Sequence, residues 1–89
     1  MPAMRIRIRG RVQGVGFRWF ARVQARRLGV SGWVANRPDG TVEVAASGEQ
    51  TRLDEFRRAL KRGPDGADVE AIDDLDPVDD HDFPFTVRR

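Results

Sequence analysis

A candidate anion-binding segment lies at positions 10–18, where the residues read Gly-Arg-Val-Gln-Gly-Val-Gly-Phe-Arg. Gly14 and Gly16 can adopt backbone angles that are closed to other residues, so that successive N–H groups converge on one point. The positive end of a following helix dipole would add to the attraction for an anion. Arg18 would place a planar guanidinium at the rim, where it can bind a phosphate through two hydrogen bonds. The segment is therefore a candidate anion cradle, and a purely structural turn fits the same spacing.

A second candidate is Asn36, a polar residue that ends a strand-like segment shortly before Pro38, Asp39 and Gly40. Asparagine is favoured in turns because its side chain can bond to the backbone two residues further on. The residues alone therefore favour a turn role for Asn36 over a role in a site, and both interpretations stay open.

The residue types that the chain lacks exclude much of enzyme chemistry. It contains no cysteine and a single histidine, His81, so thiolate nucleophiles, disulfides, zinc sites and Ser-His-Asp triads lose their support. His81 stands among aspartates and is expected to be a solvated loop residue rather than a base or a metal ligand. Trp19 and Trp33 are expected to serve surface and sheet packing rather than to stack on a ligand.

Length and composition indicate a single folded domain over residues 1–89, because 89 residues leave no chain for a second core. Hydrophobic residues make up 39% and charged residues 34%, which is a soluble globular balance. No apolar run approaches the roughly 18 residues that a membrane span needs. The start of the chain lacks the apolar stretch of a signal peptide, so we expect a cytoplasmic protein.

The charge is unevenly distributed, although the formal net charge is only +2. Residues 1–62 carry 14 basic and 5 acidic side chains, whereas residues 63–89 carry 2 basic and 9 acidic ones. Two interpretations are open: the acidic segment folds beside a basic N-terminal strand and neutralises it, or the basic part forms a polyanion-binding face. The first is the plainer interpretation.

The first half of the chain predicts a strand, a helix and a hairpin. Apolar residues alternate with arginines over residues 4–12, which is typical of a strand with one solvated face. Apolar residues recur at helical spacing over residues 17–28, and Gly29 follows at the place of a C-terminal cap. Residues 30–35 and 41–46 are strand-like and are joined by a turn.

The second half predicts another helix and two short strands. Ser47 and Gln50 resemble a capping box, and the helical spacing after them ends at Gly63. Residues 69–75 and 83–87 are strand-like. This order predicts an α+β, ferredoxin-like βαββαβ sandwich, in which two helices cover one face of an antiparallel sheet, with a short extra C-terminal strand.

Two segments resemble the signatures of the acylphosphatase family. Residues 10–18 are similar to the first signature, and residues 32–43 (Gly-Trp-Val-Ala-Asn-Arg-Pro-Asp-Gly-Thr-Val-Glu) are similar to the second. The resemblance extends over nearly the whole chain and weakens after Gly63. It implies an enzyme that hydrolyses an acyl phosphate to a carboxylate and inorganic phosphate without a metal or an organic cofactor.

The same resemblance implies a role for each candidate residue. Arg18 would bind the phosphoryl group, and the amide oxygen of Asn36 would position the attacking water. The loop amides that would share in phosphate binding belong to Gln13, Gly14, Val15, Gly16, Phe17 and Arg18. The implied partner is a small-molecule acyl phosphate, with no nucleic acid, no membrane and a monomeric protein. Since an acyl phosphate already carries a good leaving group, positioning and charge stabilisation suffice for its hydrolysis.

Three other interpretations compete with this one. A ferredoxin-like RNA-binding module stacks bases on aromatic residues of its central strands, and residues 4–12 and 41–46 contain none. A regulatory or purely structural domain of the same fold would have no use for Arg18 at a glycine-lined helix start. Similar domains also occur within larger hydrogenase-maturation proteins that act on carbamoyl phosphate, but the length of 89 residues favours a free-standing enzyme.

Overall fold

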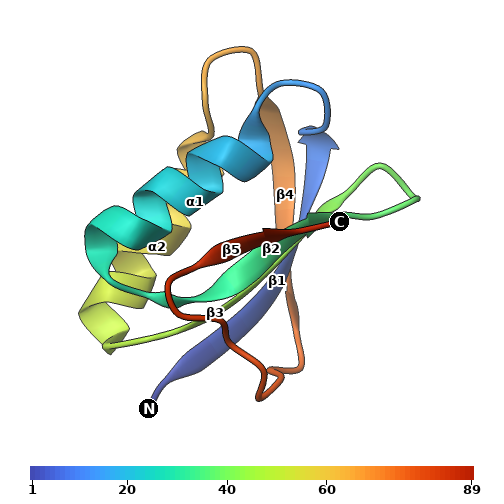
Figure 1. Cartoon of the computed structure of the whole chain (residues 1–89). Coiled ribbons are helices and arrows are strands. Elements are labelled where there is room, and N and C mark those ends of the chain that lie inside the picture. The colour runs from blue at the N-terminus through green and yellow to red at the C-terminus, as the bar shows by residue number, and fades with distance from the viewer.

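The computed structural model describes all residues from Met1 to Arg89 (Figure 1). Five strands and two helices follow one another in the order β1 (Ala3–Arg11), α1 (Phe17–Leu28), β2 (Ser31–Asn36), β3 (Val42–Ser47), α2 (Gln50–Arg62), β4 (Asp68–Leu75) and β5 (Thr86–Arg88). This is the order that the sequence predicts, except that the last strand is shorter and begins later than residue 83. Neither helix has the length and apolar character that crossing a membrane would require.

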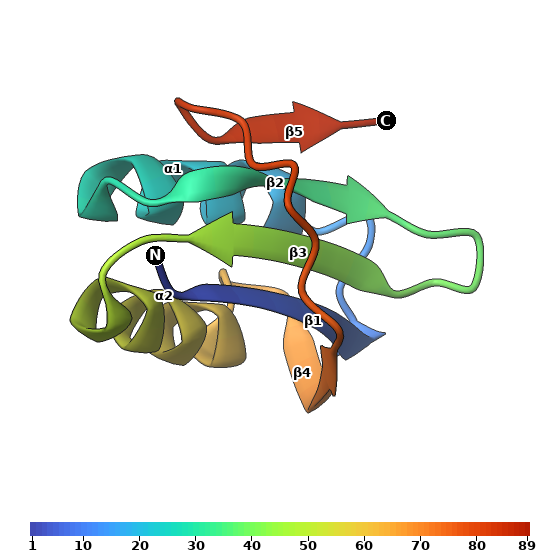
Figure 2. The same cartoon turned by 90° about the horizontal axis from the view of Figure 1, so that it is seen from below.

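The strands form one sheet in the order β4-β1-β3-β2-β5, and both helices lie on the same face of it (Figure 2). Strand β1 pairs antiparallel with both β3 and β4, and β2 pairs antiparallel with β3. The ferredoxin-like prediction is confirmed in this arrangement. One detail was wrong: the sheet is mixed rather than antiparallel, because β5 pairs parallel to β2.

The chain between β4 and β5 explains the parallel pairing. It leaves one edge of the sheet, crosses the face opposite the helices and returns along the other edge (Figure 2). Arg5 of β1 donates to the carbonyl of Asp76, and the backbone N–H of Gly32 in β2 donates to the carbonyl of Asp82. The crossing segment is thereby bonded to β1 and β2, the two strands next to the edges of the sheet, and it delivers β5 beside β2.

The core lies between the sheet and the helices, as the alternating pattern of β1 predicts. Ile6 and Ile8 point inward and are fully buried, and Phe56 of α2 meets Phe85 edge-on with ring centroids 5.6 Å apart. Helix α1 contributes the spaced residues Phe17, Ala21, Ala25 and Leu28. Burial of these apolar surfaces holds α1 against the sheet and so fixes the position of its first turn.

On the face of the sheet that lacks helices, carboxylates neutralise the arginine side chains. The carboxylate of Asp73 accepts a hydrogen bond from Arg9, which holds the pKa of Asp73 below its usual value. Burial raises the pKa of Glu43, but the hydrogen bonds and positive charges of Arg37 and Arg5 outweigh burial and lower it. The pair of Arg9 with Asp73 agrees with the interpretation that the acidic C-terminal part compensates the basic N-terminal part, whereas Glu43 belongs to the basic part itself.

The C-terminus of α1 agrees with the prediction from the sequence, whereas the N-terminus of α2 differs from it. Gly29 ends α1 in the left-handed conformation with a φ of 69°, as a C-terminal glycine does. The predicted capping box was wrong, since Glu49 precedes α2 and makes no side-chain cap. Ser47 still belongs to β3 and donates to the carbonyl of Pro2, while Gln50 donates to Asp54 one turn later.

Candidate active site

The loop between β1 and α1 has the backbone geometry that an anion cradle requires. Gly14 and Gly16 both have a φ of 76°, a left-handed conformation that favours glycine over residues with a side chain. None of the N–H groups from Gly14 to Arg18 donates to another backbone group. Helix α1 has no side-chain cap and no acidic residue in its first turn. Its positive end is therefore left for an external anion.

Arg18 lies in the first turn of α1, half-buried and without an acidic partner. Several other arginines of the protein are engaged in ion pairs: Arg5 and Arg37 hold Glu43, and Arg88 holds Asp80. No ion pair of the protein involves Arg18. A guanidinium at the positive end of a helix, with no carboxylate nearby, is set up to bind an anion from solution.

Asn36 ends β2, opposite Val42 of β3, and its side-chain oxygen Oδ1 is buried and accepts no hydrogen bond. The turn that follows is held by other groups. The Asp39 carboxylate accepts from both the N–H and the hydroxyl of Thr41. The Asn36 side chain therefore does not perform the turn role that the sequence favoured. A buried acceptor without a donor costs free energy unless water or a ligand satisfies it.

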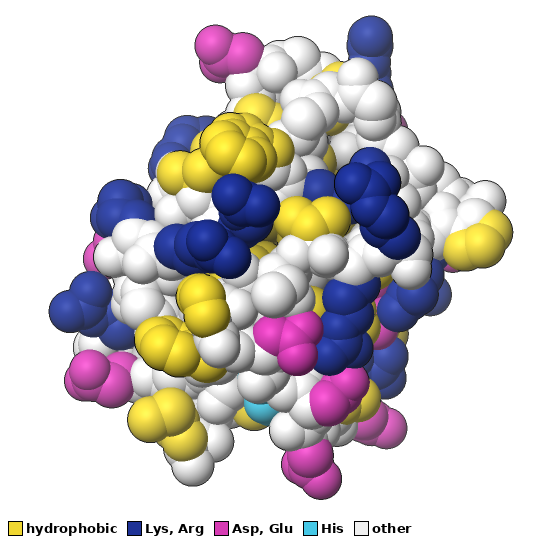
Figure 3. Space-filling view, viewed as in Figure 1, with side chains coloured by type: hydrophobic (Ala, Val, Ile, Leu, Met, Phe, Trp, Pro, Cys, Tyr) yellow, Lys and Arg dark blue, Asp and Glu magenta, His cyan; other side chains and the backbone are white.

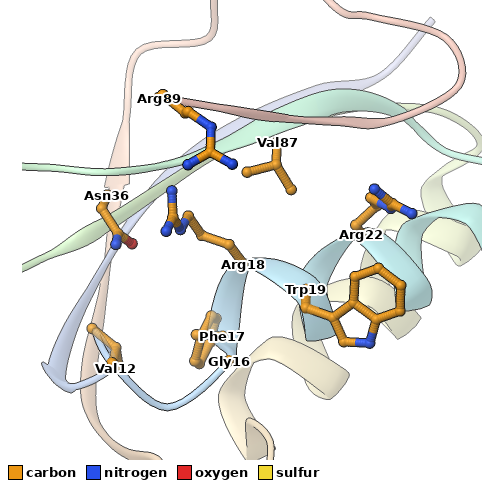
Figure 4. A pocket seen from close by; sticks show the side chains of 10 residues that line it. Val12, Gly16, Phe17, Arg18, Trp19, Arg22, Asn36, Val87 and Arg89 are labelled. Carbon is orange, nitrogen blue, oxygen red and sulfur yellow. The ribbon is translucent and has the colours of Figure 1, made fainter.

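One pocket of about 330 Å³ brings these groups together (Figure 4). It is lined by Val12, Gly14, Gly16, Phe17, Arg18, Trp19, Arg22, Asn36, Val87 and Arg89. No acidic residue is among them, and the volume lies at the small end of the range for small-molecule sites. Figure 3 shows Lys and Arg side chains around the area between the start of α1 and the C-terminus, with no acidic side chain between them.

Of the predicted phosphate-binding residues, Gln13 and Val15 do not line this pocket. Val15 packs against the hydrophobic core. The side-chain amide of Gln13 turns away and donates to the carbonyls of Arg37 and Thr41, at 2.8 and 2.9 Å. Only the backbone N–H groups of Gln13 and Val15 are thus left for an anion. The Gln13 side chain instead ties the loop to the turn that follows Asn36.

We expect Gln13→Leu to remove the two hydrogen bonds that hold the loop against the turn after Asn36. Two carbonyls lose a donor, which should lower the free energy of unfolding by about 1 to 2 kcal/mol. Because the loop and Asn36 would no longer be held in register, kcat/KM for an acyl phosphate should fall about tenfold. Gln24→Leu is the control, because the Gln24 side chain accepts only from exposed Arg27 in the same helix. Unchanged kcat/KM in a destabilised Gln13→Leu protein would refute the positioning role of Gln13.

Several residues that line the pocket were not predicted from the sequence. Val87 and Arg89 come from the C-terminal segment, where no site residue was expected, and Arg22 comes from the second turn of α1. Trp19 is 61% exposed and lies at the pocket with the Arg22 guanidinium 4.6 Å from its ring centre. The signal was present in the alternation of the last strand, because continuing it beyond Val87 places Arg89 on the same face.

His81 lies away from the pocket. It is half-buried rather than fully solvated as expected, and its Nε2 is buried without a partner. Its neighbours are bonded to β2, since the carbonyls of Asp80 and Asp82 accept from the Trp33 side chain and the Gly32 backbone. Trp33 packs with Ala35, Ala45 and Val78, in agreement with its predicted packing role. The structure does not bring His81 to Arg18 or Asn36.

Fold and pocket together define a small α+β domain with a cationic, glycine-lined pocket at a helix N-terminus. A family model described as Acylphosphatase matches residues 4–85, and the chain belongs to this family. It is 49% identical over 84 residues to an acylphosphatase of Salinibacter ruber, covering 93% of this chain and 88% of that protein.

Solved structures agree with this assignment. The crystal structure of acylphosphatase from Bacillus subtilis superimposes with a TM-score of 0.88 at 36% identity, and each chain is covered completely. HypF from T. kodakarensis contains a similar part, with a TM-score of 0.82 at 30% identity. That match covers 99% of this chain but 12% of the HypF chain. The likeness to HypF therefore concerns one part of a much longer protein.

Proposed function

We propose that the pocket around Arg18 and Asn36 hydrolyses acyl phosphates, and that it does so without a metal or an organic cofactor. The observation that carries the proposal is the buried, unpartnered Oδ1 of Asn36, in the same pocket as the unpaired Arg18 guanidinium. An acceptor for water and a donor for phosphoryl oxygens are the two groups that such a hydrolysis needs. The substrate is accordingly a small molecule, and we propose that a cytoplasmic monomer suffices.

Arg18 and the free N–H groups of the loop bind the phosphoryl group. Negative charge is spread over the phosphoryl oxygens in the transition state, and preformed donors stabilise it without reorganising. Arginine suits this role because its planar fork offers two parallel hydrogen bonds. These donors neutralise charge that would otherwise repel the attacking water.

Asn36 positions the attacking water. Its Oδ1 accepts one hydrogen of the water, which directs an oxygen lone pair toward phosphorus. The new oxygen–phosphorus bond forms as the bond to the carboxylate oxygen breaks, and the carboxylate departs with the electron pair. The proton released by the water passes to a phosphate oxygen or to solvent. A carboxylate is a weakly basic leaving group, so neither a strong base nor a general acid is required.

The pH dependence tests whether a titrating base takes part. Arginine stays protonated and a side-chain amide does not ionise near neutrality, so kcat/KM should be level between about pH 5.5 and pH 8. A fall on the acid side should reflect protonation of the phosphate of the substrate. His81→Gln and an added chelator should leave the plateau unchanged. A steep ionisation of the free enzyme within this range that disappears in His81→Gln would instead identify His81 as a base.

A further inference from the structure

The wall of the pocket opposite α1 is formed by the C-terminal segment, where Arg88 ends β5 and Arg89 follows it, and the two arginines point in opposite directions. Arg88 turns to the face that lacks helices, where it bonds to Asp80 and Asp82 and lies 4.8 Å from the centre of the Trp33 ring. Val87 and Arg89 both line the pocket. The alternation of an extended strand explains the difference, since neighbouring residues point to opposite faces. One arginine is neutralised within the protein, and the other is not.

The strand register places Arg89 beside the proposed site of hydrolysis. In the parallel pairing of β5 with β2, Val87 lies opposite Val34, and Arg88 lies opposite Ala35. One further step along both strands brings Arg89 level with Asn36. Figure 4 shows the guanidinium groups of Arg18 and Arg89 and the Asn36 amide directed toward one another. Two elements far apart in the sequence thus deliver cations to the same space.

The charges of this space are unbalanced. Neither Arg18 nor Arg89 forms an ion pair with an acidic side chain, and no acidic side chain lines the pocket. Two facing cations repel each other, and an anion bound between them adds an attraction to each cation that outweighs this repulsion. Arg22 differs, because its guanidinium lies over the ring of Trp19. The phosphoryl group of an acyl phosphate carries up to two negative charges, which match the charges of Arg18 and Arg89.

We propose that Arg89 is a second phosphoryl-binding residue, which closes a two-arginine clamp with Arg18 across the pocket. The inference rests on the proposed function for the identity of the anion. Each guanidinium binds phosphoryl oxygens from its own side, so that the dianion is favoured over the singly protonated form. Because Arg89 follows β5 and is exposed, its replacement should leave the fold intact.

Calorimetric titration with inorganic phosphate tests the clamp. The protein variants are wild type, Arg89→Gln, Arg89→Lys and Arg22→Gln, the last as a control that removes an equal charge from the same pocket. Arg89→Gln should raise the Kd for phosphate about tenfold, equivalent to about 1.4 kcal/mol. Arg89→Lys should recover part of that loss, and Arg22→Gln should stay within about twofold of wild type. Melting temperatures without phosphate verify that every variant is folded.

Two outcomes would overturn the clamp. In the first, the Kd of Arg89→Gln for phosphate stays within twofold of wild type. In the second, Arg22→Gln weakens phosphate binding as much as Arg89→Gln, which would indicate that the overall positive potential of the pocket, rather than contact with Arg89, determines the affinity. Phosphate binding is measured without turnover, so the two proposals fail separately. A wild-type protein that shows the predicted binding pattern but does not hydrolyse acyl phosphates would refute the proposed function and leave the clamp standing.

Discussion

Arg18→Gln is expected to abolish most phosphate binding and to lower kcat/KM for acyl phosphates by about 10³-fold. The guanidinium interacts with the phosphoryl group both in the ground state and in the transition state, so its loss affects binding and turnover together. Phosphate at 100 times its Kd should stabilise the wild type by about 2.7 kcal/mol, and this stabilisation should largely vanish in the variant. Thermal unfolding across a phosphate titration measures it.

Arg22→Gln serves as the matched control for Arg18→Gln. Both residues lie in α1 and line the pocket, but Arg22 stacks on Trp19. We expect the control to keep nearly all of the stabilisation by phosphate. If Arg18→Gln kept it as well, the anion would not bind at the start of α1, and the role given to Arg18 would be wrong.

Asn36→Ala is expected to separate chemistry from binding. Loss of the water acceptor should lower kcat about 100-fold, because the attacking water is no longer held in line with the breaking bond. The affinity for inorganic phosphate should stay close to that of wild type, since Asn36 contributes no charge to the cradle. Kinetics with an acyl phosphate and calorimetry with phosphate give the two quantities.

Asn36→Asp adds a second arm to this experiment. The carboxylate keeps an acceptor oxygen but adds a negative charge beside the phosphoryl group, so it should weaken phosphate binding as well as turnover. Full turnover in Asn36→Ala would refute the role of Asn36 in positioning the attacking water.

Local sequence patterns were sufficient to predict the two elements that flank the glycine loop and carry Arg18. The alternation that buries Ile6 and Ile8 defines β1, and the helical spacing of Phe17 and Leu28 defines α1. Where these two elements meet, the glycine loop and Arg18 follow directly. Such patterns are readable because one face of each element is buried and the other is solvated.

Contacts between segments far apart in the sequence could not be predicted from such local patterns. The Gln13 side chain bonds to carbonyls 24 and 28 residues away, and no local pattern marks such a pair. Arg89 reaches the pocket only because the chain crosses the open face after β4 and returns parallel to β2. The crossing segment is polar and without periodicity, so its path depends on hydrogen bonds to the folded sheet.

Release of inorganic phosphate from a simple acyl phosphate such as acetyl phosphate, with a chelator present, tests the central claim most directly. We predict that wild type releases phosphate well above the spontaneous rate, and that folded Arg18→Gln and Asn36→Ala proteins both lose most of this activity. Wild-type turnover that the chelator abolishes, or turnover that survives in both variants, would contradict hydrolysis by Arg18 and Asn36.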